Sequence, residues 1–477
     1  MVCVKAEDAA MNGTAAWMIP PRMAPHPGRS AWNDRQRSRV AKALPARYLS
    51  AEEPRPMNAI AQDAASQLEA AARAARAAAG QVARAPRPAK DLALRTAAAT
   101  LRANQAAVLA ANAEDLAEAT GLTAAYVDRL TLTPARVEAM AQGLEEVAAL
   151  EDPVGRVLAE WRRPNGLLMR RVAQPIGVIG MVFESRPNVT ADAAALCLKS
   201  GNAVILRGGR ESLRSAGAIH ACIVEGLRAA GLPEAAVQVA TTADRAFVGA
   251  MLRAAGLIDL IIPRGGKGLV QRVQQESRVP VLAHAEGLCH TYIHAAADPA
   301  MARSVLANAK MRRTGVCGAT ETLLIDAACA PDLLPLLVAD LAALGCGFRA
   351  NEAARAICPA LPAATDADFA TEWLDNMLSV AVVDGVDTAL AHIRRFGSEH
   401  TEAIITEDAE AATAFLNGLD SAVGMWNAST QFCDGGEFGF GAEIGIATGR
   451  LHARGPVGLE QLCTYRYHVL GTGQTRP

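Results

Sequence analysis

A strand–helix–strand pattern near the middle of the chain decides the fold class. Residues 176–206 read IGVIGMVFESRPNVTADAAALCLKSGNAVIL. The first eight residues and the last four are almost continuously apolar, and the segment 190–200 between them is rich in Ala and Leu. Short apolar strands separated by helices are typical of a parallel sheet that is covered on both faces.

The same alternation continues toward the C-terminus. Gly201, Gly231 and Gly256 stand where the intervening helices should end. The pattern predicts two parallel-sheet α/β domains. The further strand candidates are 237–240, 257–262, 279–282, 291–294, 321–325, 379–383, 403–405 and 422–426, with a last one at 462–470.

Two other regions have patterns of their own. Residues 57–150 are predicted to be helical, because apolar residues recur at helical spacing and Thr133-Pro134 is typical of a helix start. Residues 155–174 alternate apolar and polar residues around Pro164-Asn165-Gly166. This predicts a β-hairpin.

Composition excludes several classes of protein. A length of 477 residues predicts two or three domains. With 47 Lys and Arg against 49 Asp and Glu, the chain has no global basic field for nucleic acid or a membrane surface. No run of about 18 apolar residues predicts a membrane span. The ten cysteines include no C-x-x-C pair, so we expect reduced thiols and a cytoplasmic protein.

Residues 1–56 differ from the rest of the chain. They hold seven of the 24 prolines and show no apolar periodicity. Such a segment does not bury enough apolar surface to offset the entropy of ordering. We predict a disordered N-terminal extension, and its mild basic excess leaves a targeting or nucleic-acid-binding tail as the alternative.

Two loops at the ends of predicted strands suit anions. Gly265-Gly266 lies between a strand and a helix, where backbone N–H groups and the helix dipole favour a pyrophosphate or the nicotinamide end of a dinucleotide. Arg207 and Arg210 follow the strand at 203–206 and could grip the 2′-phosphate of NADP. A plain turn and a solvated loop are the respective alternatives.

Cys317 is the candidate nucleophile among the cysteines. It lies between Val316 and Gly318 in a turn rich in small residues, a few positions after Arg312 and Arg313. A reactive cysteine must be a thiolate, and nearby positive charge lowers the thiol pKa. The bland alternative is a small buried core residue.

A metal site is not predicted. His284 and His290 bracket Glu286, but no H-E-x-x-H motif is present. His290 and His294 lie on a predicted strand, where a four-residue spacing does not match that of helical ligands.

Five motifs, taken together, resemble the gamma-glutamyl phosphate reductases, a branch of the aldehyde dehydrogenase superfamily. The similarity runs in unbroken order from about Met57 to Gly471. The motifs are 183–190 (FESRPNVT), 199–209 (KSGNAVILRGG), 262–268 (IPRGGKG), 430–445 and 451–459.

The resemblance implies a domain organisation for the whole chain. It implies a cofactor-binding domain at 57–151 and 173–285, and a catalytic domain with a nucleophilic cysteine at 286–439. It also implies an oligomerisation element formed by the hairpin at 152–172 and the C-terminal residues 440–477, and hence a homo-oligomer.

The resemblance also implies an activity, the NADPH-dependent reduction of L-glutamyl 5-phosphate to L-glutamate 5-semialdehyde in proline biosynthesis. Cys317 matches the family's nucleophile. Arg207 and the Gly265-Gly266 loop match the positions that hold the adenosine and nicotinamide ends of NADP(H). Two departures affect the geometry near the thiol: Thr314 stands where relatives often have Pro, and Gly318 where many have Asn.

This chemistry leads to further site predictions. Asn188 is the first choice for the oxyanion donor, because it lies between a strand end and a helix start. Arg186 is the alternative. Arg454 and Glu437 are candidates for the glutamyl carboxylate and amino groups, or for members of structural ion pairs. Glu286 is predicted not to activate water.

Three other functions are weighed against this one. A CoA-acylating or ordinary aldehyde dehydrogenase would need a CoA channel or a water-activating Glu. A cysteine hydrolase would pair Cys317 with His290 or His452 and bind no nicotinamide. A non-catalytic oligomeric scaffold is the third, and the presence of Cys317 argues against it.

Overall fold

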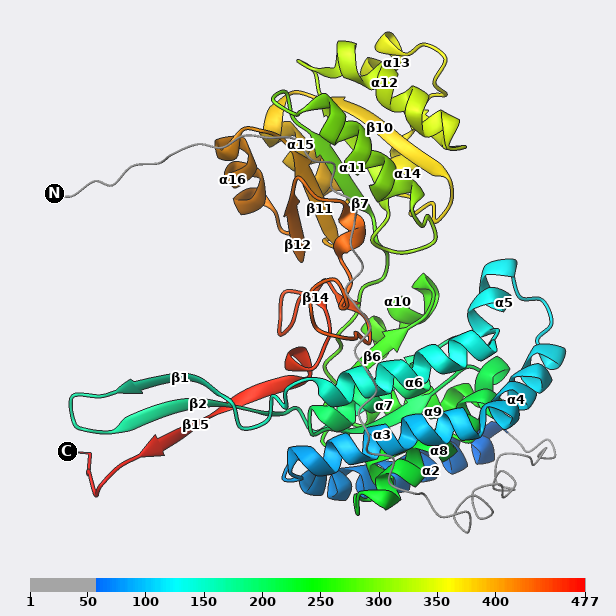
Figure 1. The fold of residues 1–477 in the computed structure, drawn as a ribbon, viewed down its shortest axis with the longest axis vertical. Helices are drawn as coiled ribbons and strands as arrows, with labels where there is room; N and C mark the ends of the chain where they lie inside the picture. The colour runs from blue at the N-terminus through cyan, green and yellow to red at the C-terminus, as the bar shows by residue number, and fades with distance from the viewer. Residues whose placement is uncertain (1–56, 477) are drawn as a thin grey trace, which may run out of the picture. The chain divides into compact units, whose positions relative to one another are not determined.

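The structure is a computed structural model that describes residues 57–476. It contains two parallel sheets covered by helices and a three-stranded antiparallel sheet (Figure 1). The predicted fold class, parallel-sheet α/β domains with a small β element, is confirmed. The predicted extension at 1–56 lies outside the described residues.

The first parallel sheet has four strands in the order β5-β4-β3-β6. Successive side chains of strand β3 face two different cores: Ile179 and Met181 face one, and Val178 and Val182 face the other. This period of two explains why a continuously apolar strand is buried on both sides. The strands are β3 (Val178–Phe183), β4 (Ala203–Arg207), β5 (Val237–Val239) and β6 (Leu260–Arg264).

Helices cover both faces of this sheet. On one face α2 and α9 share a core with β3, and on the other α3, α6, α7 and α8 pack together (Figure 1). The predicted helical region thus holds five helices: α2 (Met57–Val82), α3 (Arg87–Ala103), α4 (Gln105–Glu118), α5 (Ala124–Leu130) and α6 (Pro134–Ala149). The helices after β3 are α7 (Val189–Lys199), α8 (Leu213–Ala229), α9 (Arg245–Arg253) and α10 (Lys267–Glu276).

The second parallel sheet has six strands in the order β12-β11-β7-β8-β10-β9. Its strands are β7 (Cys289–Ile293), β8 (Thr320–Asp326), β9 (Gly347–Ala350), β10 (Met377–Val383), β11 (Thr401–Ile405) and β12 (Val423–Trp426). Its helices are α11 (Pro299–Met311), α12 (Ala330–Ala343), α13 (Glu352–Ile357), α14 (Asp366–Phe369), α15 (Gly385–Phe396) and α16 (Ala409–Gly418). Three short 3-10 helices precede α8, β5 and β13, and a fourth precedes β15.

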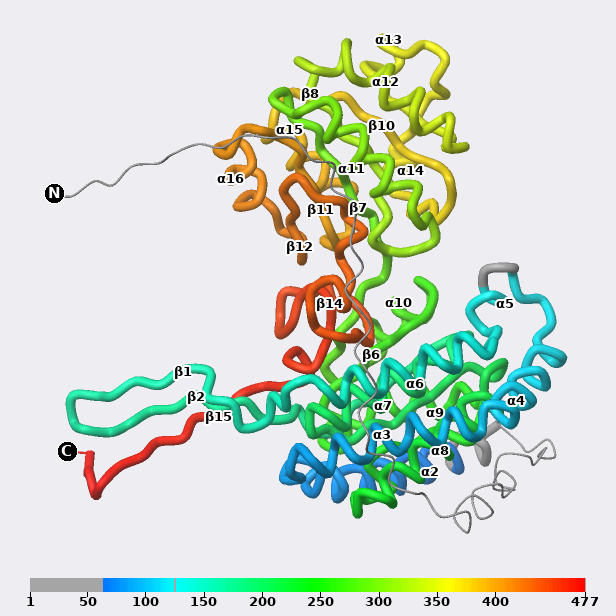
Figure 2. Tube along the Cα trace, in the orientation of Figure 1, coloured from blue at the N-terminus to red at the C-terminus, as the bar shows by residue number. Residues whose placement is uncertain are grey.

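The predicted hairpin is confirmed, and it carries the C-terminal strand. β1 (Val157–Arg162) and β2 (Leu168–Pro175) are antiparallel, and β15 (Cys463–Leu470) pairs with β2 along its whole length (Figure 2). Trp161, Tyr465 and Tyr467 on this sheet are exposed.

Two C-terminal segments belong to the first parallel-sheet domain, which contains β3–β6, rather than to the hairpin. β13 (Ile446–Ala447) and β14 (Gly455–Pro456) form a small ribbon. Five residues of this region lie in the core that also contains α3, α6 and α8: Ile444, Ala447, Val457, Leu459 and Leu462.

One predicted strand is wrong. Residues 279–282 make only a single bridge to the first sheet, between Val281 and Ile261. Pro280 accepts a hydrogen bond from Ile261 N but has no N–H to donate, so the ladder does not extend. In the described part of the chain, no helix combines the length and apolarity that a membrane crossing requires.

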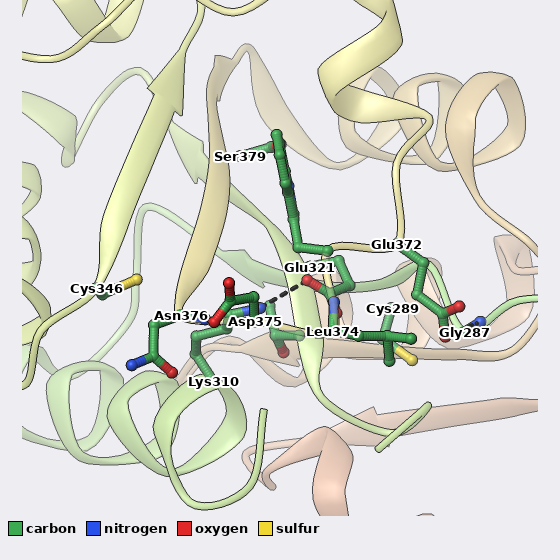
Figure 3. Close-up of polar contacts among 12 residues, drawn as sticks. Gly287, Cys289, Lys310, Glu321, Cys346, Glu372, Leu374, Asp375, Asn376 and Ser379 are labelled. Carbon is green, nitrogen blue, oxygen red and sulfur yellow. Dashed lines mark hydrogen bonds and ion pairs between the residues drawn. The ribbon is translucent and has the colours of Figure 1, made fainter. Parts of the chain in front are cut away.

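A buried ion pair links α11 to β8 in the second parallel-sheet domain. Lys310 near the end of α11 lies 2.6 Å from Glu321 on β8, and both side chains are almost fully buried (Figure 3). Burial raises the pKa of Glu321 to about 7, and Lys310 opposes that rise. Removing one partner alone would leave an unpaired polar group in the core.

We expect Gly226→Ala to destabilise the protein. A Cβ at Gly226 on α8 would lie 2.2 Å from Ala93 O and 3.1 Å from Ala97 Cβ, both on α3. Overpacking of this kind costs about 1–3 kcal/mol. The midpoint of urea unfolding measures the change.

Gly143→Ala is the matched control. Gly143 also lies inside a helix, but a Cβ there meets nothing within 4 Å. Helix propensity alone then predicts stabilisation by up to about 1 kcal/mol. A stabilised Gly226→Ala protein would contradict the close contact between α3 and α8.

Candidate functional site

Cys317 lies in the loop between α11 and β8. Asp298 caps the start of α11 by accepting a hydrogen bond from Met301 N at 2.7 Å. The helix ends at Met311, and the loop that follows includes Gly315 and Gly318. Cys317 is partly exposed in this loop. We call residues 312–319 the nucleophile loop.

A second segment, residues 283–289, packs directly against the nucleophile loop. A Cβ at Gly287 would lie 2.1 Å from Cys317 O and 2.7 Å from Cys317 Cα. Only glycine allows so close an approach between the two backbones. The Cys289 thiol at the start of β7 donates to Cys317 O at 3.0 Å. These contacts fix the backbone beneath the candidate nucleophile.

His284 presents a basic nitrogen to the thiol. Its Nδ1 lies 2.8 Å from Ile446 O. Because a carbonyl only accepts hydrogen bonds, Nδ1 must carry the proton, and in the neutral ring Nε2 is the acceptor. The His284 ring and the Cys317 thiol lie within 4.8 Å of each other, and the thiol raises the pKa of His284.

His400 lies on the other side of this pair. It is fully buried immediately before β11, and its Nδ1 lies 2.9 Å from Thr401 Oγ1. The His284 and His400 rings meet edge to face, with centroids 5.1 Å apart. The Cys317 Sγ and one nitrogen from each ring all lie within 4.8 Å of one another.

This arrangement favours a thiolate at Cys317. Burial alone would raise the thiol pKa, but His400 and His284 outweigh it and hold the pKa well below the ordinary value. In return, although burial lowers the pKa of His284, the contact with Cys317 raises it above its usual range. The pair is therefore stabilised as thiolate and imidazolium.

The other cysteines that the structure describes are in the opposite state. Burial raises the pKa of each of them, to about 12 for Cys433 and well above the ordinary value for Cys289. The remaining thiols with raised pKa are Cys197, Cys222, Cys329, Cys346, Cys358 and Cys463.

Two carboxylates lie near the thiol, Glu286 within the 283–289 segment and Glu372 beside it. Glu286 is ion-paired with Lys267 at 2.7 Å. Glu372 accepts a hydrogen bond from Gly287 N at 2.8 Å (Figure 3), and burial, with a contribution from the Cys317 thiolate, raises its pKa. Neither carboxylate makes a direct contact with the Cys317 thiol.

Asn188 immediately precedes α7, beyond the end of β3, and its side chain makes no capping hydrogen bond. Its Nδ2 donates to Asp192 Oδ2 at 2.9 Å, which leaves the second N–H of the amide free for another acceptor. Burial raises the pKa of Asp192 to about 6, and Asn188 opposes the rise. Arg186, the alternative donor, lies in the same loop and senses the charge on Cys317.

The predicted cofactor residues lie at the carboxyl ends of β4 and β6, the two strands on either side of β3. Arg207 ends β4, and its Nη2 donates to Ala243 O at 2.7 Å, whereas its buried Nε has no hydrogen-bond partner. Arg210 is exposed and contacts no acid or acceptor within residues 57–476. Gly265 and Gly266 follow β6, and Gly266 N donates to Glu184 at 3.0 Å.

The two predicted substrate-binding residues lie apart. Arg454 donates to Thr448 O at 3.0 Å and to Glu399 at 3.3 Å, so its guanidinium ties backbone segments together. Glu437 is exposed in the loop after Cys433, with no hydrogen bond or ion pair in the described residues.

The histidines weighed for a hydrolase are not at the thiol. His290 is bound to Glu402 at 2.9 Å, and His452 is exposed with Nε2 2.9 Å from Gln461 O. The sequence reasoning missed His400 and considered His284 only for a metal. A histidine next to a strand of the second sheet, at the edge where the nucleophile loop lies, was the available signal.

The same three side chains offer donors to a metal ion. A thiolate and two imidazoles are ligands that zinc prefers. A metal bound there would occupy the lone pair with which Cys317 reacts. The expectation that no metal takes part stays a prediction.

Comparisons with known proteins agree in one family. Residues 50–360 match the aldehyde dehydrogenase family. A gamma-glutamyl phosphate reductase from Gluconobacter oxydans is 77% identical over 74% of this chain and 83% of its own length. One from Acidiphilium cryptum is 67% identical over 86% of this chain and 97% of its own.

The chain belongs to the gamma-glutamyl phosphate reductase family. The crystal structure of the gamma-glutamyl phosphate reductase from Thermotoga maritima superposes with a TM-score of 0.84 at 42% identity, covering 86% of this chain and all of that one. As a member of this branch of the aldehyde dehydrogenases, the protein is an oxidoreductase, and the family implies a nicotinamide cofactor.

We expect His284→Gln to raise the pKa of Cys317. Glutamine keeps a donor for Ile446 O but has no basic nitrogen. The wild-type Cys317 should react with iodoacetamide at a rate that changes little between pH 6.5 and 9. In the variant the rate at pH 7 should fall about tenfold or more and recover as the pH rises through the new pKa.

His452→Gln is the matched control, because His452 also binds a backbone carbonyl but lies away from the thiol. Mass spectrometry of the Cys317 peptide separates this thiol from the others. A pH profile in His284→Gln identical to that of wild type would contradict the role of His284.

Proposed function

We propose that this protein reduces L-glutamyl 5-phosphate to L-glutamate 5-semialdehyde and phosphate with NADPH, through a thioester on Cys317. The observation that carries the proposal is the low-pKa thiol of Cys317 beside His284 and His400. It occurs in a chain that is 77% identical, over 74% of its length, to a gamma-glutamyl phosphate reductase.

Acylation needs a nucleophile and a leaving group. The Cys317 thiolate attacks the carbonyl carbon of the acyl phosphate, and the C–O bond to phosphate breaks. Phosphate is a good leaving group, so the site needs little acid catalysis at this step. His284 and His400 lower the pKa of Cys317 and so keep it ionised before the attack.

The oxyanion that forms on the carbonyl needs hydrogen-bond donors. The backbone N–H of Cys317 and the free N–H of Asn188 are the proposed pair, and each such donor is typically worth about 2.7–4 kcal/mol. The same donors would serve the second oxyanion, in the reduction of the thioester.

The chain's residues fit a nicotinamide dinucleotide at the edge of the first sheet. Glycines at the start of α10 and unpaired donors on Arg207 and Arg210 lie at the carboxyl ends of β6 and β4, two parallel strands on either side of β3, where such cofactors bind. Arg207 and Arg210 would hold the 2′-phosphate of NADP, and Gly265 and Gly266 the nicotinamide end. When bound, the reduced cofactor supplies the hydride.

A reductase must also protect its thioester from water. Glu286 is held in an ion pair with Lys267 at 2.7 Å, which supports the prediction that it does not activate water. Hydride delivery, rather than hydrolysis, is then the proposed fate of the thioester.

The remaining proposals concern the whole molecule. We assign cofactor binding to residues 57–151 and 173–285, catalysis to 286–439, and assembly into a homo-oligomer to the hairpin and C-terminal residues. Exposed aromatic residues on the β1-β2-β15 sheet support the last assignment. A cytoplasmic location in proline biosynthesis follows from the reaction.

The test runs the reaction in reverse, with glutamate semialdehyde, NADP⁺ and phosphate. We expect turnover to require phosphate, and Cys317→Ala to lose about a thousandfold or more of it. Without phosphate, wild type should form about one NADPH per active site and a glutamyl adduct on Cys317 that mass spectrometry detects. Cys358→Ala, another partly exposed thiol, should retain activity; full activity in Cys317→Ala would reject the proposal.

Cofactor choice has a separate test. We expect Arg210→Ala to weaken NADP⁺ binding about tenfold or more and to leave NAD⁺ binding unchanged, because a guanidinium–phosphate contact is lost. Titration calorimetry measures both. Equal losses for the two cofactors would remove Arg210 from the 2′-phosphate site.

A further inference from the structure

Four arginines, one of them in the nucleophile loop and three from other segments, act on one another's charge near Cys317. Arg186 lies in the loop after β3, Arg264 ends β6, Arg129 is on α5, and Arg313 is in the nucleophile loop itself. Arg264, Arg129 and Arg313 each act on the charge of Arg186, and so does the Cys317 thiolate. The mechanism above uses none of the four guanidinium groups.

Independent backbone contacts bring these segments together. β3 and β6 are neighbouring parallel strands with Phe183 opposite Arg264, and Glu184 N donates to Arg264 O at 3.1 Å. A Cβ at Gly266 would lie 3.0 Å from the hydroxyl of Tyr126, so α5 lies against the loop after β6. Arg264 Cδ lies 4.0 Å from the position of a Cβ at Gly445, and the next residue, Ile446, contacts His284 through its carbonyl. The loop after β3, the end of β6 and α5 therefore meet close to the thiol and its imidazole.

For three of the four arginines, a carboxyl group, an aromatic ring or solvent offsets the positive charge of the guanidinium. Arg264 acts on the buried carboxyl groups of Asp192 and Glu443. The Arg129 guanidinium lies over the Tyr126 ring, 5.6 Å from its centroid. Arg313 is exposed to solvent.

Arg186 is different. It is half-buried, and within residues 57–476 its guanidinium makes no hydrogen bond and no ion pair; only its backbone carbonyl accepts, from Val189 N at 3.1 Å. Burial, reinforced by Arg264 and Arg129, lowers its pKa to about 10, and the Cys317 thiolate opposes that shift. A partly buried guanidinium with no hydrogen-bonded acceptor, close to other guanidinium groups, is a site that favours an added anion.

We propose that Arg186 is the phosphate receptor of the active site, which binds the phosphate that leaves the acyl group and that enters in the reverse reaction. The proposal rests on the proposed function. A guanidinium presents two parallel N–H groups that match two phosphate oxygens. In the reverse direction a phosphate oxygen attacks the thioester carbon, the C–S bond breaks, and its electron pair returns to Sγ.

This role differs from that of an oxyanion donor. A phosphate receptor acts only in the half-reaction that contains phosphate. An oxyanion donor also acts when the aldehyde first reduces the cofactor and acylates Cys317, a step that needs no phosphate. The two half-reactions therefore separate the roles.

The test compares wild type with Arg186→Met and Arg186→Lys in the reverse reaction. We expect Arg186→Met to raise KM for inorganic phosphate about tenfold or more, and to leave the rate of the phosphate-free NADPH burst within about twofold of wild type. Arg186→Lys keeps the charge without the paired N–H groups. Its KM for phosphate should lie between that of wild type and that of Arg186→Met. Phosphate should also slow alkylation of Cys317 in wild type and much less in Arg186→Met.

Arg278→Met is the matched control, an exposed arginine that is also unpaired in the described residues and should change neither quantity. A slowed burst with unchanged KM for phosphate would make Arg186 an oxyanion donor and overturn the proposal. A raised KM for the semialdehyde alone would place the substrate carboxylate there and also overturn it. No burst in wild type would reject the proposed function first, and this proposal with it.

Discussion

The active site depends on the pairing of one thiolate with two imidazoles. A thiol in a mostly buried position is normally protonated, as the raised pKa values of its neighbours Cys289 and Cys433 show. Cys317 escapes this because His284 and His400 compensate its charge. Three separate segments must meet for this to happen, and the close approach at Gly287 is what allows two of them to do so.

The sequence predicted the elements of the fold better than their limits. Apolar runs such as 178–183 must be buried on both faces, which identifies parallel strands without any knowledge of the tertiary structure. The failure at 279–282 has a local cause, because those residues are apolar enough for a strand but Pro280 limits their pairing. The order of strands within each sheet depends on contacts between distant residues, and no local pattern carries that information.

In the candidate site, too, only the features that depend on neighbouring residues in the sequence could be predicted. Cys317 could be singled out because the small residues around it are adjacent in the chain. His400 could not, because it is 83 positions away and its neighbours resemble any strand start. Arg312 and Arg313 were the predicted sources of positive charge, yet the imidazoles lower the thiol pKa most. Nearness in sequence was a poor guide to nearness in space.

The position of the last residues has a consequence for biosynthesis of the chain on the ribosome. Five residues between Ile444 and Leu462 lie in the core that also contains α3 and α8, and β15 pairs with β2, which is made almost three hundred residues earlier. The first parallel-sheet domain is therefore still incomplete while the whole second domain is being translated. Until the final strand is made, part of the apolar core of the first domain is exposed and the edge of β2 is unpaired. During that interval a chaperone would find a binding surface.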